Sequence, residues 1–171
     1  LHAQFRRQRQ MCIRDSHPVH MFYQGSTEIK PNVLGIKGIA GHYAVDTGDG
    51  LVMIDAGSQL DIDTSYEEIK KWRPETPLKS VIFTHHHVDH IFSVKHFDEE
   101  NKKNGIAQPI VYGHELMPDH FDRYIKTNAW NTAINRRQFA IDVEHFQWPT
   151  EYRYPDITYR DNISFECGNL T

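Results

Sequence analysis

Short apolar runs and longer amphipathic stretches take turns along this chain, and each kind predicts its own type of element. Five runs rich in β-branched or aromatic residues predict β-strands, at residues 32–40, 42–45, 51–54, 79–83 and 109–112. Apolar residues that recur every three or four positions predict helices at 61–72, 91–101 and 117–140. This order of strands and helices predicts an α/β fold.

Residues that start or stop regular structure refine these boundaries. Asp61 or Asp63 is expected to cap the first helix, and Pro118 is expected to interrupt the third. Residues 46–50 (Asp-Thr-Gly-Asp-Gly) predict a hairpin turn, because Asp and Gly tolerate positive φ. The remaining expectations are a loop or edge segment at 17–31, a solvated helix face at 98–103 and a short strand at 163–166.

Length and composition narrow the class of protein. A chain of 171 residues with 39% apolar and 25% charged residues can form one globular domain with a hydrophobic core. No apolar run approaches the length of a membrane span. The formal charge of −4 argues against a dedicated nucleic-acid surface, and two cysteines are too few for a disulfide framework. Oligomeric state and cellular compartment are left open.

The first residues have a separate origin. Residues 6–16 (Arg-Arg-Gln-Arg-Gln-Met-Cys-Ile-Arg-Asp-Ser) match, codon by codon, the translation of a widely used transposase sequencing adaptor. The alternative, a basic targeting arm, lacks the apolar stretch of a signal peptide. We therefore interpret residues 1–16 as a sequencing artefact that is expected to be disordered. Residues 17–171 are left as the folded part.

The candidate chemistry lies directly behind the strand predicted at 79–83. His85 and His87 are two residues apart, so in an extended segment both side chains project to one side. Asp89 and His90 can then face the same point from the other side. Imidazole nitrogen and carboxylate oxygen are ligands that zinc takes at about 2.0–2.2 Å. The spacing predicts one metal held by His85 and His87 and a second held by Asp89 and His90; the alternative is a histidine-rich surface loop without a catalytic role.

Two motifs together resemble a known family. The pattern His85-x-His87-x-Asp89-His90 resembles the signature of the metallo-β-lactamase superfamily, and residues 50–57 (Gly-Leu-Val-Met-Ile-Asp-Ala-Gly) resemble its first motif. The resemblance extends over residues 33–137. It implies a partial metallo-β-lactamase-like αββα sandwich, truncated after its first half, because family members take further ligands from later in their chains. The chain is thus expected to be an N-terminal fragment, inactive by itself.

Residues 113–137, with the sequence Asn-Arg-Arg at 135–137, look like the alkylsulfatase-like branch of that superfamily. The resemblance implies a zinc-dependent hydrolase of alkyl sulfates or related small-molecule esters, with two Zn²⁺ ions in the complete protein and Asp89 orienting the nucleophile. Carboxylic esters, lactones and lactams stay open. Arg136 or Arg137 could clamp an anionic head group, or both could pair with nearby surface acids.

Asp55, at the end of the strand 51–54, has two interpretations. Its carboxylate could support the metal loop by hydrogen bonds, or it could be an ordinary turn residue. The sequence also departs from the family's pattern: Phe92 and Ser93 stand where glycines are usual, and His86 adds a competing imidazole. Because of these departures, the alternative that the chain is a non-catalytic metal-binding module stays open. A redox di-iron site is disfavoured, because His87 occupies the position of a glutamate.

Overall fold

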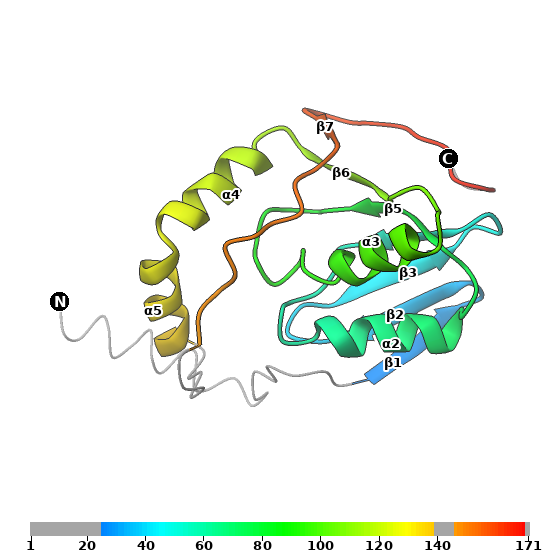
Figure 1. Ribbon diagram of the computed structural model, residues 1–171, viewed down its shortest axis with the longest axis horizontal. Helices are drawn as coiled ribbons and strands as arrows, with labels where there is room; N and C mark the ends of the chain where they lie inside the picture. The colour runs from blue at the N-terminus through cyan, green and yellow to red at the C-terminus, as the bar shows by residue number, and fades with distance from the viewer. Residues whose placement is uncertain (1–24, 139–145, 170–171) are drawn as a thin grey trace.

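The computed structural model describes residues 25–138 and 146–169, so the proposed adaptor-derived segment 1–16 lies outside the described residues. Its framework is one seven-stranded sheet in which the strands follow their sequence order (Figure 1). The strands are β1 (Gly25–Lys30), β2 (Val33–Lys37), β3 (His42–Asp46), β4 (Leu51–Ile54), β5 (Leu78–Ile82), β6 (Ile110–His114) and β7 (Ile157–Tyr159). The segment expected as a loop or an edge thus supplies the edge strand β1.

The sheet has an antiparallel half and a parallel half. Strands β1 to β4 pair antiparallel, whereas β4, β5, β6 and β7 pair parallel. The predicted hairpin joins β3 to β4, with Gly48 at φ 81° and Gly50 at φ 148°. Because β4, β5 and β6 are parallel, their carboxyl ends meet at the same edge, where a ligand site is expected.

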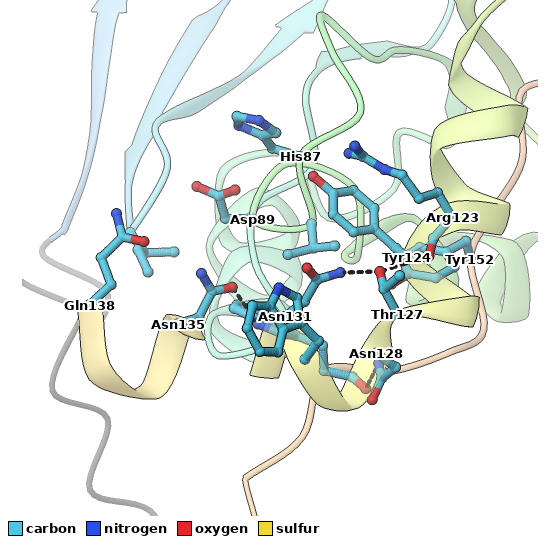
Figure 2. A pocket seen from close by; sticks show the side chains of 14 residues that line it. His87, Asp89, Arg123, Tyr124, Thr127, Asn128, Asn131, Asn135, Gln138 and Tyr152 are labelled. Carbon is cyan, nitrogen blue, oxygen red and sulfur yellow. Dashed lines mark hydrogen bonds between the residues drawn. The ribbon is translucent and has the colours of Figure 1, made fainter. Parts of the chain in front are cut away.

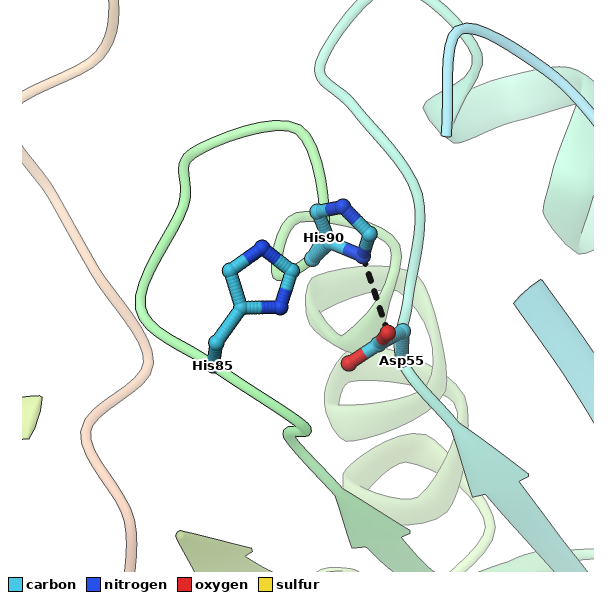
Figure 3. A group of neighbouring side chains, drawn as sticks. All are labelled: Asp55, His85 and His90. Atoms are coloured by element: carbon cyan, nitrogen blue, oxygen red, sulfur yellow. Dashed lines mark hydrogen bonds and ion pairs between the residues drawn. The ribbon is translucent and has the colours of Figure 1, made fainter. Parts of the chain in front are cut away.

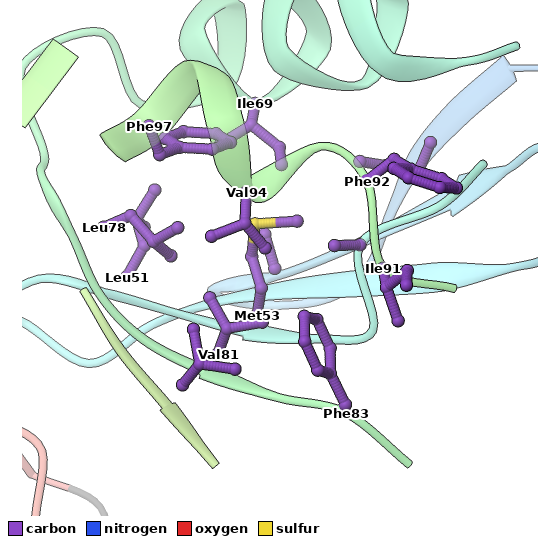
Figure 4. Close-up of a cluster of buried hydrophobic side chains, with 14 of the residues drawn as sticks. Leu51, Met53, Ile69, Leu78, Val81, Phe83, Ile91, Phe92, Val94 and Phe97 are labelled. Carbon is purple, nitrogen blue, oxygen red and sulfur yellow. The ribbon is translucent and has the colours of Figure 1, made fainter. Parts of the chain in front are cut away.

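Two helices cover one face of this sheet. Helices α2 (Ile62–Trp72) and α3 (Val94–Lys103) lie side by side in front of the strands (Figure 1). Fully buried side chains such as Met53, Ile69 and Phe97 fill the space between helices and sheet (Figure 4). Helices α4 (Met117–Lys126) and α5 (Asn128–Gln138) lie beyond the strand ends (Figure 1). Within the described residues, no helix has the length and apolar character to cross a membrane.

Two predictions about helix boundaries were tested. Asp61 occupies the N-cap position of α2, as predicted, but its side chain makes no capping hydrogen bond. It accepts hydrogen bonds from Ser58 Oγ and the Ile39 N–H instead. Pro118 does not interrupt a helix, since it lies in the first turn of α4, where proline is tolerated. The break comes instead at Thr127, between α4 and α5.

Tertiary packing made one further prediction wrong and left another only partly right. Residues 163–166 form no strand; the Phe165 ring stacks on Tyr112 at 4.2 Å, and the last strand is β7 instead. The charged run 98–103 is only partly solvated. Asp98 pairs with Arg153 at 3.2 Å, and buried Asn101 donates to the carbonyl of Leu78.

Candidate metal centre

The turn after β4 and the loop after β5 are joined along their backbones. Strand β4 pairs with β5, so Asp55 comes to lie beside the residues that follow β5. The Ala56 N–H donates to the His90 carbonyl at 2.6 Å, and the Ser93 N–H donates to the Ala56 carbonyl at 2.8 Å. These bonds hold residues 84–93, which we call the metal loop, against the turn at 55–57.

Gly57 allows the turn at 55–57 to lie close to the His42 ring of β3. Its φ of +63° lies in the left-handed region, and a Cβ there would lie 2.8 Å from Cε1 of the buried His42.

The structure accommodates the two residues that stand where the family usually has glycines. Phe92 is buried in the core, with its ring centroid 5.8 Å from that of Tyr152, and Ser93 is fully buried. The larger side chains therefore pack inside the loop without opening it.

Asp55 is the centre of the hydrogen bonds in this region. Its Oδ1 accepts from the Thr84 N–H at 2.8 Å, and its Oδ2 lies 2.7 Å from the Thr84 hydroxyl and 2.8 Å from His90 Nδ1. Burial alone would raise the pKa of Asp55, but the hydrogen bonds from His90 and Thr84 outweigh it and hold that pKa below its ordinary value. Asp55 is thus an ionised acceptor.

The same bonds fix which nitrogen of two histidines carries hydrogen. The Thr84 hydroxyl has one hydrogen and donates it to Asp55, so at 2.9 Å from His85 Nδ1 it can only accept. His85 and His90 therefore both carry hydrogen on Nδ1, toward Thr84 and Asp55 respectively. The Nε2 lone pair of each ring is left for another partner.

These rings gather at one place above the strand ends. The His85 ring centroid lies 4.1 Å from that of His90 and 4.6 Å from that of His87. Potential ligand atoms of Asp55, His85 and His90 all lie within 4.8 Å of one another (Figure 3). The oxygens of Asp55 already accept three hydrogen bonds, so we regard it as a support for the histidines rather than as a ligand.

Asp89 and His87 extend the group toward an open cavity. Asp89 Oδ2 lies 3.7 Å from His90 Nε2, the nitrogen that Asp55 leaves available. His87 and Asp89 both line a cavity of about 530 Å³, whose far wall is formed by α4 and α5 (Figure 2). The structure thus places His85 and His90 in one compact group with Asp55, and His87 and Asp89 each lie beside one of these histidines. Imidazole nitrogens with available lone pairs beside a carboxylate are a donor set that fits a divalent metal ion.

His86 does not join this group. Its ring stacks on His120 of α4, with centroids 3.9 Å apart and planes at 12°. Burial, followed by the charges of His120 and other neighbours, lowers the pKa of His86 to about 4. The imidazole that was expected to compete for metal is therefore engaged with a helix.

The cationic side of the cavity is also not the expected one. Arg136 and Arg137 are exposed on α5 and are not among the residues that line the cavity. Arg123 of α4 lines it instead, with its guanidinium carbon 5.3 Å from the Tyr124 ring centroid. Arg123 lies one helical turn before Thr127, another lining residue, but that relationship could not be predicted because the cavity itself is formed by segments distant in sequence.

The fold and the site define an α/β domain with histidines and carboxylates clustered at the carboxyl ends of parallel strands. A family model described as the metallo-beta-lactamase superfamily matches residues 42–158, more than half of the chain. The chain belongs to the metallo-β-lactamase superfamily. The predicted fold class, a partial metallo-β-lactamase fold, is confirmed.

Individual relatives include alkylsulfatases. A linear primary-alkylsulfatase from Pseudomonas sp. (strain ATCC 19151) is 32% identical over 79 residues, which are 44% of this chain and 14% of that protein. The stereoselective inverting sec-alkylsulfatase Pisa1 from Pseudomonas sp. superposes with a TM-score of 0.51 at 24% identity, over 66% of this chain and 18% of that one. The chain therefore spans a small part of the length of both alkylsulfatases.

A metallo-beta-lactamase from Cronobacter sakazakii with a HARLDQ motif superposes over a larger share of both chains. Its TM-score is 0.60 at 14% identity, over 86% of this chain and 51% of that one. At this identity the similarity shows the fold alone.

Proposed function

We propose that this chain carries a metal-binding motif of a zinc-dependent hydrolase that acts on anionic esters, with alkyl sulfates as the preferred substrates. The observation that supports this most is the orientation of two imidazoles. Asp55 and Thr84 occupy Nδ1 of His90 and His85, so that both Nε2 atoms are available beside His87 and Asp89. The relationship to a linear primary-alkylsulfatase supports the substrate class.

Each residue of the site has a distinct part in this proposal. His85 and His87 would hold one ion, and His90 and Asp89 would border a second. Bound zinc would act as a Lewis acid that polarises the ester and promotes ionisation of water. The Asp89 carboxylate faces the cavity, where it can accept a hydrogen bond from the attacking water and orient it.

The cavity wall supplies groups suited to an amphiphilic anion. The Arg123 guanidinium can form charge-assisted hydrogen bonds with a sulfate or carboxylate head group. Val88, Trp130 and Trp148 line the same cavity and offer apolar surface to a hydrocarbon chain. This combination favours a charged head with an apolar tail over a small neutral ester.

The test measures zinc content and hydrolysis in the same preparations. The complete protein of which this chain is expected to be the N-terminal part is loaded with zinc and assayed with decyl sulfate and with p-nitrophenyl acetate. The double variant His85→Ala/His87→Ala is compared with His96→Ala. His96 is a matched control because it pairs with Asp63 at 2.7 Å, away from the metal loop. We expect the double variant alone to lose zinc and decyl sulfate hydrolysis. Turnover that survives in it would disprove the proposal, and zinc binding without any hydrolysis would favour a non-catalytic module.

A further inference from the structure

His86 lies between two of the proposed ligands, yet its ring belongs to a different group. Its centroid is 6.4 Å from that of His85 but only 3.9 Å from that of His120. The His86 and His120 rings are nearly parallel, at 12°. Ring nitrogens carry their lone pairs in the ring plane, so two rings stacked face to face do not direct those lone pairs at a shared ion. The contact is therefore a packing contact between the metal loop and α4.

Helix α4 meets the metal loop and the core through neighbouring residues. His120 and Tyr124 are one helical turn apart, and both lie beside His86, with the Tyr124 ring centroid at 5.8 Å. Phe121 is fully buried and stacks on Tyr152 at 5.1 Å. The core contact holds α4 from one side, and the His86 contact joins it to the metal loop.

That separation matters because the helix and the loop form opposite walls of one cavity. Arg123 and Tyr124 line it from α4, while His87 and Asp89 line it from the metal loop (Figure 2). His86 directly precedes His87, and His120 lies one turn before Tyr124. The stack therefore joins the two walls next to residues that line the cavity.

We propose that the His86–His120 stack is a positioning clamp that holds α4 at a fixed distance from the metal loop. His86 and His120 are positioning residues in this scheme and bind neither metal nor substrate. The clamp itself does not depend on the proposed hydrolysis; only its effect on substrate affinity rests on the proposed function.

The test compares His120→Ala with His120→Phe in the 171-residue chain. Phenylalanine keeps a planar ring for stacking, whereas alanine removes it. The readouts are amide hydrogen exchange of residues 117–126, exchange of β4 and β5, and zinc content. We expect His120→Ala to speed exchange of α4 roughly two- to tenfold, the effect of losing one ring pair. His120→Phe should retain the protection, and neither variant should change zinc content or exchange in the sheet.

Three results would overturn the clamp. Equal α4 protection in His120→Ala and wild type would show that the stack does not hold the helix. Failure of His120→Phe to restore protection would show that ring stacking is not the cause. Loss of zinc in either variant would show that His120 is a ligand. If His120→Ala also speeds amide exchange in β4 and β5, His86→Ser provides a second variant, which removes the ring from the metal loop instead. Only a loss of exchange protection confined to α4 in that variant supports the clamp.

Steady-state kinetics separate this inference from the proposed function. If the protein hydrolyses decyl sulfate, we expect His120→Ala to raise KM with little change in kcat, and His120→Phe to restore KM. A fall in kcat with KM unchanged would contradict a positioning role. If no variant hydrolyses any ester, the proposed function fails, while the exchange results still decide the clamp.

Discussion

Thr84 contacts Asp55 twice, through its backbone N–H to Oδ1 at 2.8 Å and through its hydroxyl to Oδ2 at 2.7 Å. The pair ties the end of β5 to the end of β4, and the same hydroxyl accepts a hydrogen bond from His85. A single threonine therefore supports the loop and selects the tautomer of a proposed metal ligand.

Replacement of the Thr84 hydroxyl should weaken metal binding without unfolding the protein. In Thr84→Val, His85 Nδ1 loses its acceptor and Asp55 loses one donor, so we expect zinc affinity to fall roughly 10- to 100-fold. Competition titration against a chromophoric chelator measures this affinity. Thr84→Ser keeps the hydroxyl and should remain close to wild type. Equal affinities in the two variants would argue against the role of the hydroxyl.

Replacement of Asp55 should reduce zinc affinity more than replacement of Thr84. Asp55 binds His90 directly and orients His85 through the Thr84 hydroxyl. Asp55→Asn keeps the size of the side chain but removes the charge and offers only one oxygen to Thr84 and His90. We expect a larger loss of zinc affinity than in Thr84→Val, together with a lower pKa for His90. NMR titration of the His90 ring measures that pKa, and an unchanged value would contradict the Asp55–His90 pairing.

Gly57 gives a prediction about stability. Gly57→Ala adds a Cβ at 2.8 Å from the His42 ring and also strains a backbone with φ of +63°. We expect a loss of about 1–3 kcal/mol in the free energy of unfolding. The matched control is Gly105→Ala, at φ +68° with no atom within 4 Å of the added Cβ. The control should cost only about 1 kcal/mol, the backbone part alone. Equal losses would mean that the His42 contact relaxes freely.

The buried His42 should make stability depend on pH. Its side chain is fully buried, and burial lowers its pKa below the ordinary histidine value of about 6.5. As pH falls below about 6.5, His42 therefore binds a proton in the unfolded chain but stays neutral in the folded chain, so the free energy of unfolding decreases. This group contributes a loss of at most about 1.4 kcal/mol per pH unit in that range. Urea unfolding of metal-free wild type and His42→Asn at pH 7.5 and 5.5 measures it; we expect a smaller pH dependence in the variant. The same dependence in both would contradict the assignment.

The sequence predicted best those features that depend on neighbouring residues. The hairpin at 46–50 follows from local turn chemistry, and strand β5 before the histidine-rich loop follows from the apolar run at 79–83. Strand β7 was missed because residues 157–159 pair with β6 although helices α4 and α5 and the irregular residues 146–156 lie between the two strands in sequence. The His86–His120 stack was equally invisible, since it joins residues 34 positions apart on different elements.

The support of the site was predicted in outline only. A carboxylate at position 55 was expected to hold the loop by hydrogen bonds, but the part played by Thr84 depends on a geometry that no spacing rule contains. The anion-binding candidate was placed on Arg136 or Arg137 because the two are adjacent in sequence. In the structure both arginines lie on an exposed part of α5, and Arg123 of α4 lines the cavity instead.

The central claim is that the histidines of residues 85–90 hold zinc, and zinc K-edge X-ray absorption of the zinc-loaded chain tests it most directly. We expect a first shell of nitrogen and oxygen at about 2.0–2.1 Å, with imidazole scattering that decreases in His85→Ala. A first shell containing sulfur at about 2.3 Å, or imidazole scattering unchanged in that variant, would contradict it.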